Sequence, residues 1–567
     1  RSSTASINVG STPSYLEPLF REHGRPIGEL TVPDLSASYA AGSGYEFLAG
    51  AHLRLGGQGM MYRKNRLPGT ANSAAWSQPA WAGDPRLTAE RVCGKVPGDK
   101  NGDGDNTDLG EPCFPHDRRD TFTGEDASYN FFPFLCIANP SSVSTWAEVA
   151  FHDEAGEFLR IYREVPASSR ITLDCNANPH LRDKNLAVEV RSVDGTPLLA
   201  ERPMYFRYHG WMDGGSDAFG STEARTAWYF AEGYASDSQP FHEYICVANF
   251  GEGTARGSMT LMPAAGDPVR VPIEVAPGAR RTYRVNSYIQ GEVSARVETD
   301  LPVVAERSLY FAYRSPGGTL VADGGHGKPG LTSLSSKWYF AEGRVSEDFD
   351  EWLLLANPGA ETALARVSFY TPGGKAAERE VAVPPLSRRT LRVNELFRSA
   401  ADVSLGVESD RPVACERAMY FRYNGAWDDG HVSPGSTMPS TRWLFAEGSA
   451  FEGMREYVLV LNPNDEAATV RARYLLGPGE GTRVIDYRIG PRSRMTIDVN
   501  AALAPDGGPS QVALDLTSSL PVVAERAMYF DMGRGGSGKE PIRGGHVSPG
   551  VGAPADTWLF AEAYTGK

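Results

Sequence analysis

The chain has 567 residues, of which 61 are Gly and 40 are Pro, and its formal net charge is −14. A chain of this length is too long for one hydrophobic core and should divide into several domains. The negative charge disfavours nucleic acid or an anionic membrane as the main partner, and the sequence has no run of about 18 apolar residues that would span a bilayer.

Residues 1–120 predict a partial β repeat with an insertion at about 82–120. Segments 4–8 and 61–62 match the back half of the later copies, whereas the connection that follows them is longer. Within the insertion, Asp and Asn alternate with other residues, and Gly104 stands at the sixth position of the run. This spacing is typical of loops whose oxygen atoms bind Ca²⁺. The predicted ligands are Asp99, Asn101, Asp103, Asp105, Asp108 and Glu111.

This calcium site is one of two interpretations of the loop, the other being a solvated acidic turn. Gly110 stands where such loops usually carry a bidentate Glu, and Glu111 follows one residue later. Cys93 and Cys113 bracket the loop and predict a disulfide, which would stabilise it by about 3 kcal/mol on loop-entropy grounds.

An aromatic signature, Trp-Tyr-Phe-Ala-Glu-Gly at 228–233, sets the period of the rest of the chain. It recurs at 338–343, 443–448 and 558–563, so the spacing is about 110 residues, and a fainter copy lies at 121–125. A period of this size indicates tandem domains. The predicted repeats are 121–227, 228–337, 338–442 and 443–556, followed by a further strand at 557–567.

Each repeat predicts several short strands. Apolar and polar residues alternate within the segments, and turn residues recur every 8 to 12 positions, including an Asp-Leu-Pro or Asp-Arg-Pro turn before the last long segment. This pattern favours an all-β fold, a tandem array of immunoglobulin-like antiparallel β-sandwiches of about 110 residues. The Trp and Phe of the signature are predicted to fill the core.

Every repeat also carries a Glu-Arg pair near its end and an Arg six residues before a recurring Asn. A catalytic Glu reproduced four times in one chain is improbable, so we expect structural ion pairs that join two strands. The predicted partners are Glu201, Glu306, Glu416 and Glu525 with Arg170, Arg280, Arg388 and Arg494. The single His of the later repeats, at His326, His431 and His546, is predicted to be a turn residue rather than a ligand.

Two further cysteines, Cys136 and Cys175, fall on neighbouring predicted strands of one repeat and predict a second disulfide. Cys246 and Cys415 lie in different repeats and are expected to be buried thiols. The predicted disulfides favour an oxidising, extracytoplasmic location.

The ordered motifs resemble a known repeat. The combination of WYFAEG, Asn-Pro, Arg-x-Thr-x-x-Val-Asn, Val-Val-Ala-Glu-Arg-x-Met-Tyr-Phe and Gly-Gly-His, over residues 121–567, resembles an uncharacterised β-sandwich repeat of secreted and cell-surface bacterial proteins of Actinobacteria and Chloroflexi type. The resemblance implies an extracellular repeat module and transfers no catalytic residue.

The sequence therefore predicts a non-enzymatic extracellular structural protein. We expect a rod of tandem sandwiches that self-associates head to tail into a surface filament or layer. The alternative is a carbohydrate-binding or adhesin array in which Trp211 and Trp427 stack on glycans; an enzyme acting on cell-wall polysaccharide ranks third. Neither nucleic acid nor a membrane span is expected.

The last signature copy, at Trp558, Leu559 and Phe560, has three interpretations. It could pair with the incomplete first unit of a neighbouring protomer and so drive polymerisation. It could be the cut end of a longer array. It could also close a unit rather than open one.

Overall fold

The computed structural model describes residues 131–566 except positions 317, 398, 452, 477–480, 505–510 and 533–541. It also describes two short strands, β1 (Ala5–Ser6) and β2 (Thr31–Val32), which pair with each other. The predicted calcium ligands at 99–111 and the predicted disulfide between Cys93 and Cys113 lie outside the described residues.

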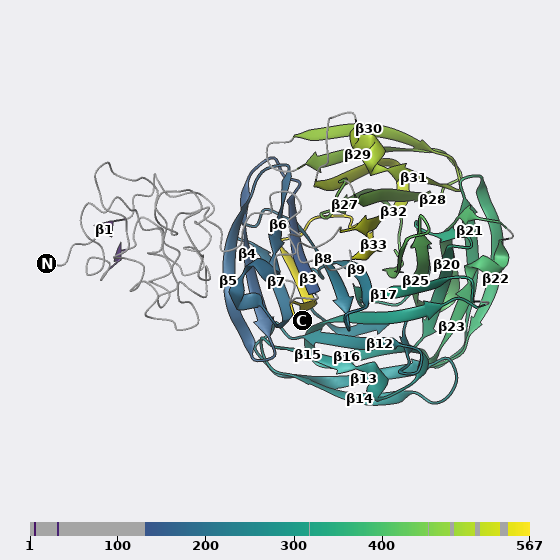
Figure 1. The fold of residues 1–567 in the computed structure, drawn as a ribbon, viewed down its shortest axis with the longest axis horizontal. Coiled ribbons are helices and arrows are strands. Elements are labelled where there is room, and N and C mark those ends of the chain that lie inside the picture. The colour runs from purple at the N-terminus through teal and green to yellow at the C-terminus, as the bar shows by residue number, and fades with distance from the viewer. Residues whose placement is uncertain are drawn as a thin grey trace.

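The described residues form an all-β protein of antiparallel sheets that is arranged as four units around a central axis (Figure 1). Unit 1 contains β3 (Phe131–Asn139), β4 (Thr145–Asp153), β5 (Gly156–Val165), β6 (Ser169–Asp174), β7 (Asn185–Ser192), β8 (Leu199–Tyr208) and β9 (Met212–Phe219), with the 3-10 turns η5 (Cys175–Ala177) and η6 (Pro179–Leu181). Unit 2 contains β10 (Arg225–Phe230), β11 (Tyr234–Ala235), β12 (Phe241–Ala248), β13 (Ala255–Pro263), β14 (Val269–Val275), β15 (Arg280–Arg284), η7 (Val285–Ser287), β16 (Gly291–Arg314) and β17 (Val321–Pro329).

The other two units repeat this order. Unit 3 contains β18 (Ser335–Phe340), β19 (Arg344–Val345), β20 (Phe349–Asn357), β21 (Ala363–Thr371), β22 (Gly374–Val383), β23 (Ser387–Arg392), η8 (Val393–Leu396), β24 (Ala401–Asp402), β25 (Ser404–Tyr423) and β26 (Trp427–Pro434). Unit 4 contains β27 (Ser440–Phe445), β28 (Met454–Asn462), β29 (Ala468–Leu476), β30 (Thr482–Ile489), β31 (Ser493–Asp498), α5 (Val499–Leu503), β32 (Val512–Asp531) and β33 (Arg543–Pro549).

A long strand organises each of units 2 to 4. The first half of β16 pairs with β10 and β13, and its second half pairs with β12 and β17; β25 and β32 have the equivalent partners. The turns predicted at Asp-Leu-Pro in unit 2 and at Asp-Arg-Pro in unit 3 are therefore wrong, because β16 runs through Pro302 and β25 runs through Pro412, and each strand changes partners there. Only unit 1 divides this strand, into β7 and β8, and Gly195 between them has a φ of 77°.

The last strand of the chain, β34 (Thr557–Tyr564), completes unit 1. It pairs with β7, with Trp558 opposite Val190 and Phe560 opposite Val188. The signature strands β10, β18 and β27 take the same place in units 2, 3 and 4. The signature therefore opens units 2 to 4, whereas its last copy joins the C-terminal end of the chain to unit 1. Figure 1 shows this yellow strand among the blue strands of unit 1.

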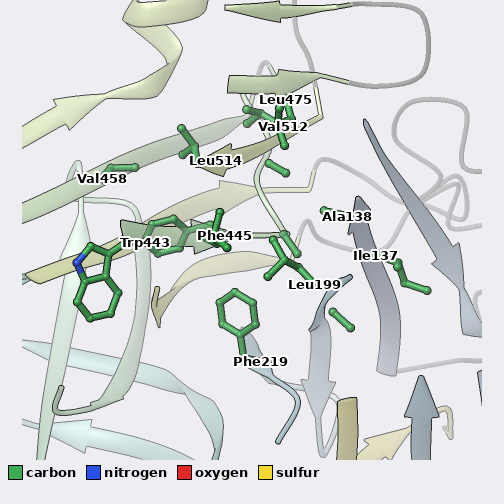
Figure 2. Close-up of a cluster of buried hydrophobic side chains, with 14 of the residues drawn as sticks. Ile137, Ala138, Leu199, Phe219, Trp443, Phe445, Val458, Leu475, Val512 and Leu514 are labelled. Atoms are coloured by element: carbon green, nitrogen blue, oxygen red, sulfur yellow. The ribbon is translucent and has the colours of Figure 1, made fainter. Parts of the chain in front are cut away.

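The four units form a closed ring instead of the predicted rod (Figure 1). Strands β9, β17, β26 and β33, one from each unit, pack against one another around the axis. The core also continues from unit to unit. Figure 2 shows Trp443, Phe445 and Leu514 of unit 4 near Leu199 and Phe219 of unit 1, within one buried cluster. A rod would leave such faces of its end units exposed, and ring closure buries them.

No helix in the described part of the chain is both long and apolar enough to cross a membrane.

Candidate functional site

The Trp and Phe residues of the aromatic signature are buried, as predicted. Trp228, Trp338 and Trp558 are at most 2% exposed, and each indole N–H donates to a backbone carbonyl of its own unit. The Trp228 Nε1 atom, for example, lies 2.8 Å from the carbonyl oxygen of Val303. This bond satisfies the polar atom of the side chain while the rest of the ring fills the core. The signature strand is thereby fixed in its unit.

A ring of buried ion pairs joins the four units. The Arg of each Glu-Arg pair contacts the Glu of the equivalent pair in the next unit. Arg307 of unit 2, for example, lies 3.0 Å from Glu416 of unit 3. The remaining contacts, which close the circle, are Arg202–Glu306 at 3.0 Å, Arg417–Glu525 at 3.8 Å and Arg526–Glu201 at 3.0 Å. All of these side chains are at most 2% exposed.

The same Arg side chains also contact the Glu of the signature in their own unit. The pairs are Arg202–Glu562 at 2.5 Å, Arg307–Glu232 at 3.3 Å, Arg417–Glu342 at 2.5 Å and Arg526–Glu447 at 2.9 Å. Each guanidinium therefore binds at least two carboxylates, one from its own unit and one from the next, and Arg526 also binds a third, Asp217 of unit 1, at 2.6 Å. Since unpaired charges are costly to bury, the arrangement is stable only when neighbouring units are in place.

The Glu of each pair has a second role, which is to accept backbone N–H groups of the preceding unit. Glu416 Oε2 accepts hydrogen bonds from the amides of Ala231 and Glu232, both at 2.7 Å. Glu201, Glu306 and Glu525 accept signature amides in the same way. These carboxylates thus hold the end of each signature strand, where the backbone leaves the sheet.

The partners predicted for these Glu residues are wrong. Each Arg that precedes the recurring Asn instead donates to a signature carbonyl of the preceding unit. The bonds are Arg170 to Gly448 at 2.8 Å, Arg280 to Ala561 at 3.1 Å, Arg388 to Gly233 at 2.6 Å and Arg494 to Gly343 at 2.9 Å. Both sets of residues join strands, but they do so between units. Sequence alone could not reveal this, because pairs within one repeat and between repeats have the same pattern.

A further buried carboxyl lies beside the signature in units 2 to 4. Burial raises the pKa of Glu243 and Glu351 to about 8 and that of Glu456 to about 7, although nearby Arg residues oppose the rise. A Cβ on Gly233 would lie 2.8 Å from Glu243 Oε1, so the Gly of the signature makes room for this carboxyl. In unit 1 the equivalent positions hold Pro133 and Ala563. In unit 1, therefore, the buried Glu and the signature Gly that makes room for it are replaced together.

An Asp at the axis binds all four units. The Asp429 side chain accepts hydrogen bonds from four backbone N–H groups, one in each central strand. The donors are Gly215 at 3.1 Å, Gly325 at 3.0 Å, Gly430 at 2.7 Å and Gly545 at 3.1 Å. The other units carry Gly at the position of Asp429, and a Cβ on Gly324 would lie 1.8 Å from Asp429 Oδ1. One carboxylate thus fills a space that four equivalent side chains could not share.

The prediction that the recurring His residues lie in turns is wrong. His326, His431 and His546 lie within β17, β26 and β33 and are at most 3% exposed. Burial lowers the pKa of each, to about 3 for His546. Successive side chains of a strand point to opposite sides, and this places the three imidazoles inside the ring. The glycines around them in the sequence did not indicate this location.

The predicted disulfide between Cys136 and Cys175 is also wrong, because both thiols are free and buried. Cys136 is opposite Thr172 in the register of β3 and β6, and Cys175 comes three residues later. Three strand residues span about 10 Å, which exceeds the Cα separation that a disulfide allows. Cys246 and Cys415 are buried thiols, as predicted.

No family model matches the chain, and no curated protein matches it. Among solved structures, it is similar to the crystal structure titled Thermotoga maritima 1070 (17% identity, 21% of this chain and 97% of that chain, TM-score 0.18). It is also similar to Anabaena sensory rhodopsin transducer (22% identity, 15% and 82%, TM-score 0.14) and to a tetra-tandem repeat in the extending region of a large adhesion protein (10% identity, 73% and 94%, TM-score 0.09). At these TM-scores the likenesses carry no argument about fold or function.

Proposed function

We propose that this chain is a non-enzymatic structural protein of the cell exterior, built from four immunoglobulin-like sandwich units of about 110 residues and used as a building block of a surface filament or layer. The observation that carries this proposal is the use of the recurring ionisable side chains. The paired Glu and Arg residues are nearly inaccessible, and they contact neighbouring units rather than a cleft. Their repetition thus serves assembly of the ring.

Assembly between chains would use the strand that already completes unit 1. β34 is contributed by the opposite end of the described residues, so the same pairing with β7 could form between two chains. Exchange of this strand would link protomers head to tail and make the chain its own partner. Trp558, Leu559 and Phe560 would then belong to the strand that joins one chain to the next.

A disulfide that locks β34 in its own chain tests the exchange. Thr557 is opposite Arg191 in the register and neither side chain is buried, so Cys at both positions can form a cross-strand bond. Concentrated wild-type protein should form polymers visible by electron microscopy, and the oxidised double variant should not. Reduction of the bond restores polymers if exchange drives assembly. Polymers that form equally in the oxidised variant would contradict it.

A second candidate function, glycan binding, is favoured by the aromatic side chains on the β8–β9 hairpin. Trp211 is 51% exposed, and Tyr208, the last residue of β8, stacks on Tyr310 with ring centroids 4.1 Å apart. Exposed aromatic faces suit the apolar faces of sugars. On a glycan array, Trp211→Ala should lose binding while Met438→Ala, at a residue that is 72% exposed, should retain it. Absence of wild-type binding would exclude this function.

The remaining elements of the proposal rest on the sequence. The resemblance to a secreted bacterial repeat family supports an extracellular or cell-surface location. The loop at 99–111 supports a structural Ca²⁺ ion in the N-terminal part of the chain.

A further inference from the structure

Three buried side chains converge where unit 4 meets unit 1. Asp217 of β9, Glu447 of the unit 4 signature and His546 of β33 each offer a ligand atom, and these atoms lie within 4.8 Å of one another. The three residues are at most 2% exposed. They come from the two units that also share the core cluster of Figure 2.

Several polar atoms of this cluster lack a hydrogen bond. Among the described residues, neither ring nitrogen of His546 has a hydrogen-bond partner and Asp217 Oδ1 accepts no hydrogen bond, while Glu447 Oε2 contacts Arg526 Nη2 at 2.9 Å. A buried imidazole with two unsatisfied nitrogens costs free energy unless something binds it. The space between these three side chains therefore has the properties of a ligand site.

The contacts of Arg526 leave ligand atoms available. Its Nη2 atom lies 2.6 Å from Asp217 Oδ2 and 2.9 Å from Glu447 Oε2, while Nη1 lies 3.0 Å from Glu201 Oε2. Asp217 can thus keep its bond to Arg526 through Oδ2 and offer Oδ1. Arg526 would remain held by Glu201 if Glu447 turned towards a metal ion.

Within the described residues, all three ligands come together at this junction alone. The position of Asp217 is taken by Gly327, Val432 and Val547 in the other units, as the strand registers show. At the junction of units 3 and 4, Glu342 and His431 are present, but Val547 replaces the Asp. The repeat therefore supplies two of the ligands at several junctions, and unit 1 alone adds the third.

We propose that Asp217, Glu447 and His546 bind a divalent first-row transition metal ion, for which Zn²⁺ is the natural probe. One imidazole nitrogen and two carboxylate oxygens form a donor set that suits Zn²⁺, and water or a backbone oxygen can complete four-coordination. Ligand atoms around a tetrahedral zinc ion lie roughly 3.3 Å apart, which small side-chain rotations from the present positions can reach. The ion stabilises the junction between unit 4 and unit 1, the unit that is completed by β34.

The test is metal retention by the full chain with matched His variants. The protein is unfolded in urea with chelator, refolded with Zn²⁺, dialysed, and analysed for metal by mass spectrometry. Wild type should retain a zinc ion, and His546→Gln should hold at least about tenfold less metal at this site than wild type. His431→Gln should retain the ion, because His431 is equally buried but its junction lacks the Asp. Cobalt should give a visible absorption band that depends on His546 and not on His431.

A second variant keeps the test valid if His546→Gln does not refold. Asp217→Asn preserves the shape and an acceptor for Arg526 but removes the charge, and it should lose the metal as His546→Gln does. Zinc should also raise the melting temperature of wild type by at least about 2–4 °C and leave that of Asp217→Asn unchanged. Equal retention by His546→Gln and His431→Gln, or no retained metal and no thermal shift in wild type, would overturn the proposal.

Discussion

Replacement of Asp429 tests whether the axis of the ring is held as the structure indicates. Oδ1 accepts the amides of Gly325 and Gly430, and Oδ2 accepts those of Gly215 and Gly545. In Asp429→Asn, one acceptor oxygen becomes an NH₂ group that faces two N–H donors. Two buried amides then lose their acceptor, and each unsatisfied amide costs about 1–3 kcal/mol. We therefore expect this variant to lose about 2–6 kcal/mol of stability, despite its nearly identical shape.

Removal of the whole side chain, in Asp429→Gly, should cost less stability than Asp429→Asn. Asp429→Gly restores the Gly-Gly sequence of the other three central strands and leaves a small polar space that points four N–H groups inward. Water or a chloride ion can occupy this space and accept those hydrogen bonds. The expected order of stability is wild type, then Asp429→Gly, then Asp429→Asn, and only the Gly variant should gain stability from added chloride over a matched salt of a larger anion.

Urea unfolding followed by circular dichroism measures these differences, with Asp428→Asn as the control. Asp428 is the neighbouring residue, it is only partly buried, and its replacement should change stability by less than about 1 kcal/mol. An Asn variant as stable as wild type, or more stable than the Gly variant, would refute the role given to the carboxylate.

Three other predictions follow from the charged residues. Arg526→Met leaves three buried carboxylates without their shared cation and should lower the free energy of unfolding in urea by about 3–5 kcal/mol. The control Arg225→Met breaks an exposed pair with Glu223 and should cost less than about 1 kcal/mol. Equal losses in the two variants would contradict the ring of ion pairs. The buried carboxyls of Glu243, Glu351 and Glu456 have raised pKa values, so in the folded protein they keep protons that the unfolded chain releases. The free energy of unfolding should therefore fall as the pH rises from 4.5 to about 8, by up to about 1.4 kcal/mol per pH unit for each titrating group. A flat profile, or one that is unchanged when all three residues are replaced by Gln, would exclude them as the cause. EDTA should lower the melting temperature and excess Ca²⁺ should restore it, and Asp103→Asn should remove this response; a Ca²⁺ response that survives in Asp103→Asn would reject the predicted loop.

Several features could be predicted from the sequence because they depend on local patterns. The alternation of apolar and polar residues indicates strands, and the recurrence of the signature sets the period of the units. The Trp and Phe residues of the signature are buried as expected, since large aromatic side chains gain most from leaving water. The structural role of the paired Glu and Arg residues also follows from their fourfold repetition, although their partners do not.

Only the tertiary structure decided that the array closes. A rod and a ring of similar units share the same local patterns, and the difference lies in the angle between neighbouring units, which no short segment encodes. Closure brings Arg526 to Glu201 and β34 to β7, contacts between residues more than 300 positions apart. It also brings the central strands together, so that Asp429, Asp217 and the His residues become buried. The sequence determined the units, and the geometry of their packing determined the ring and the polar groups at its centre.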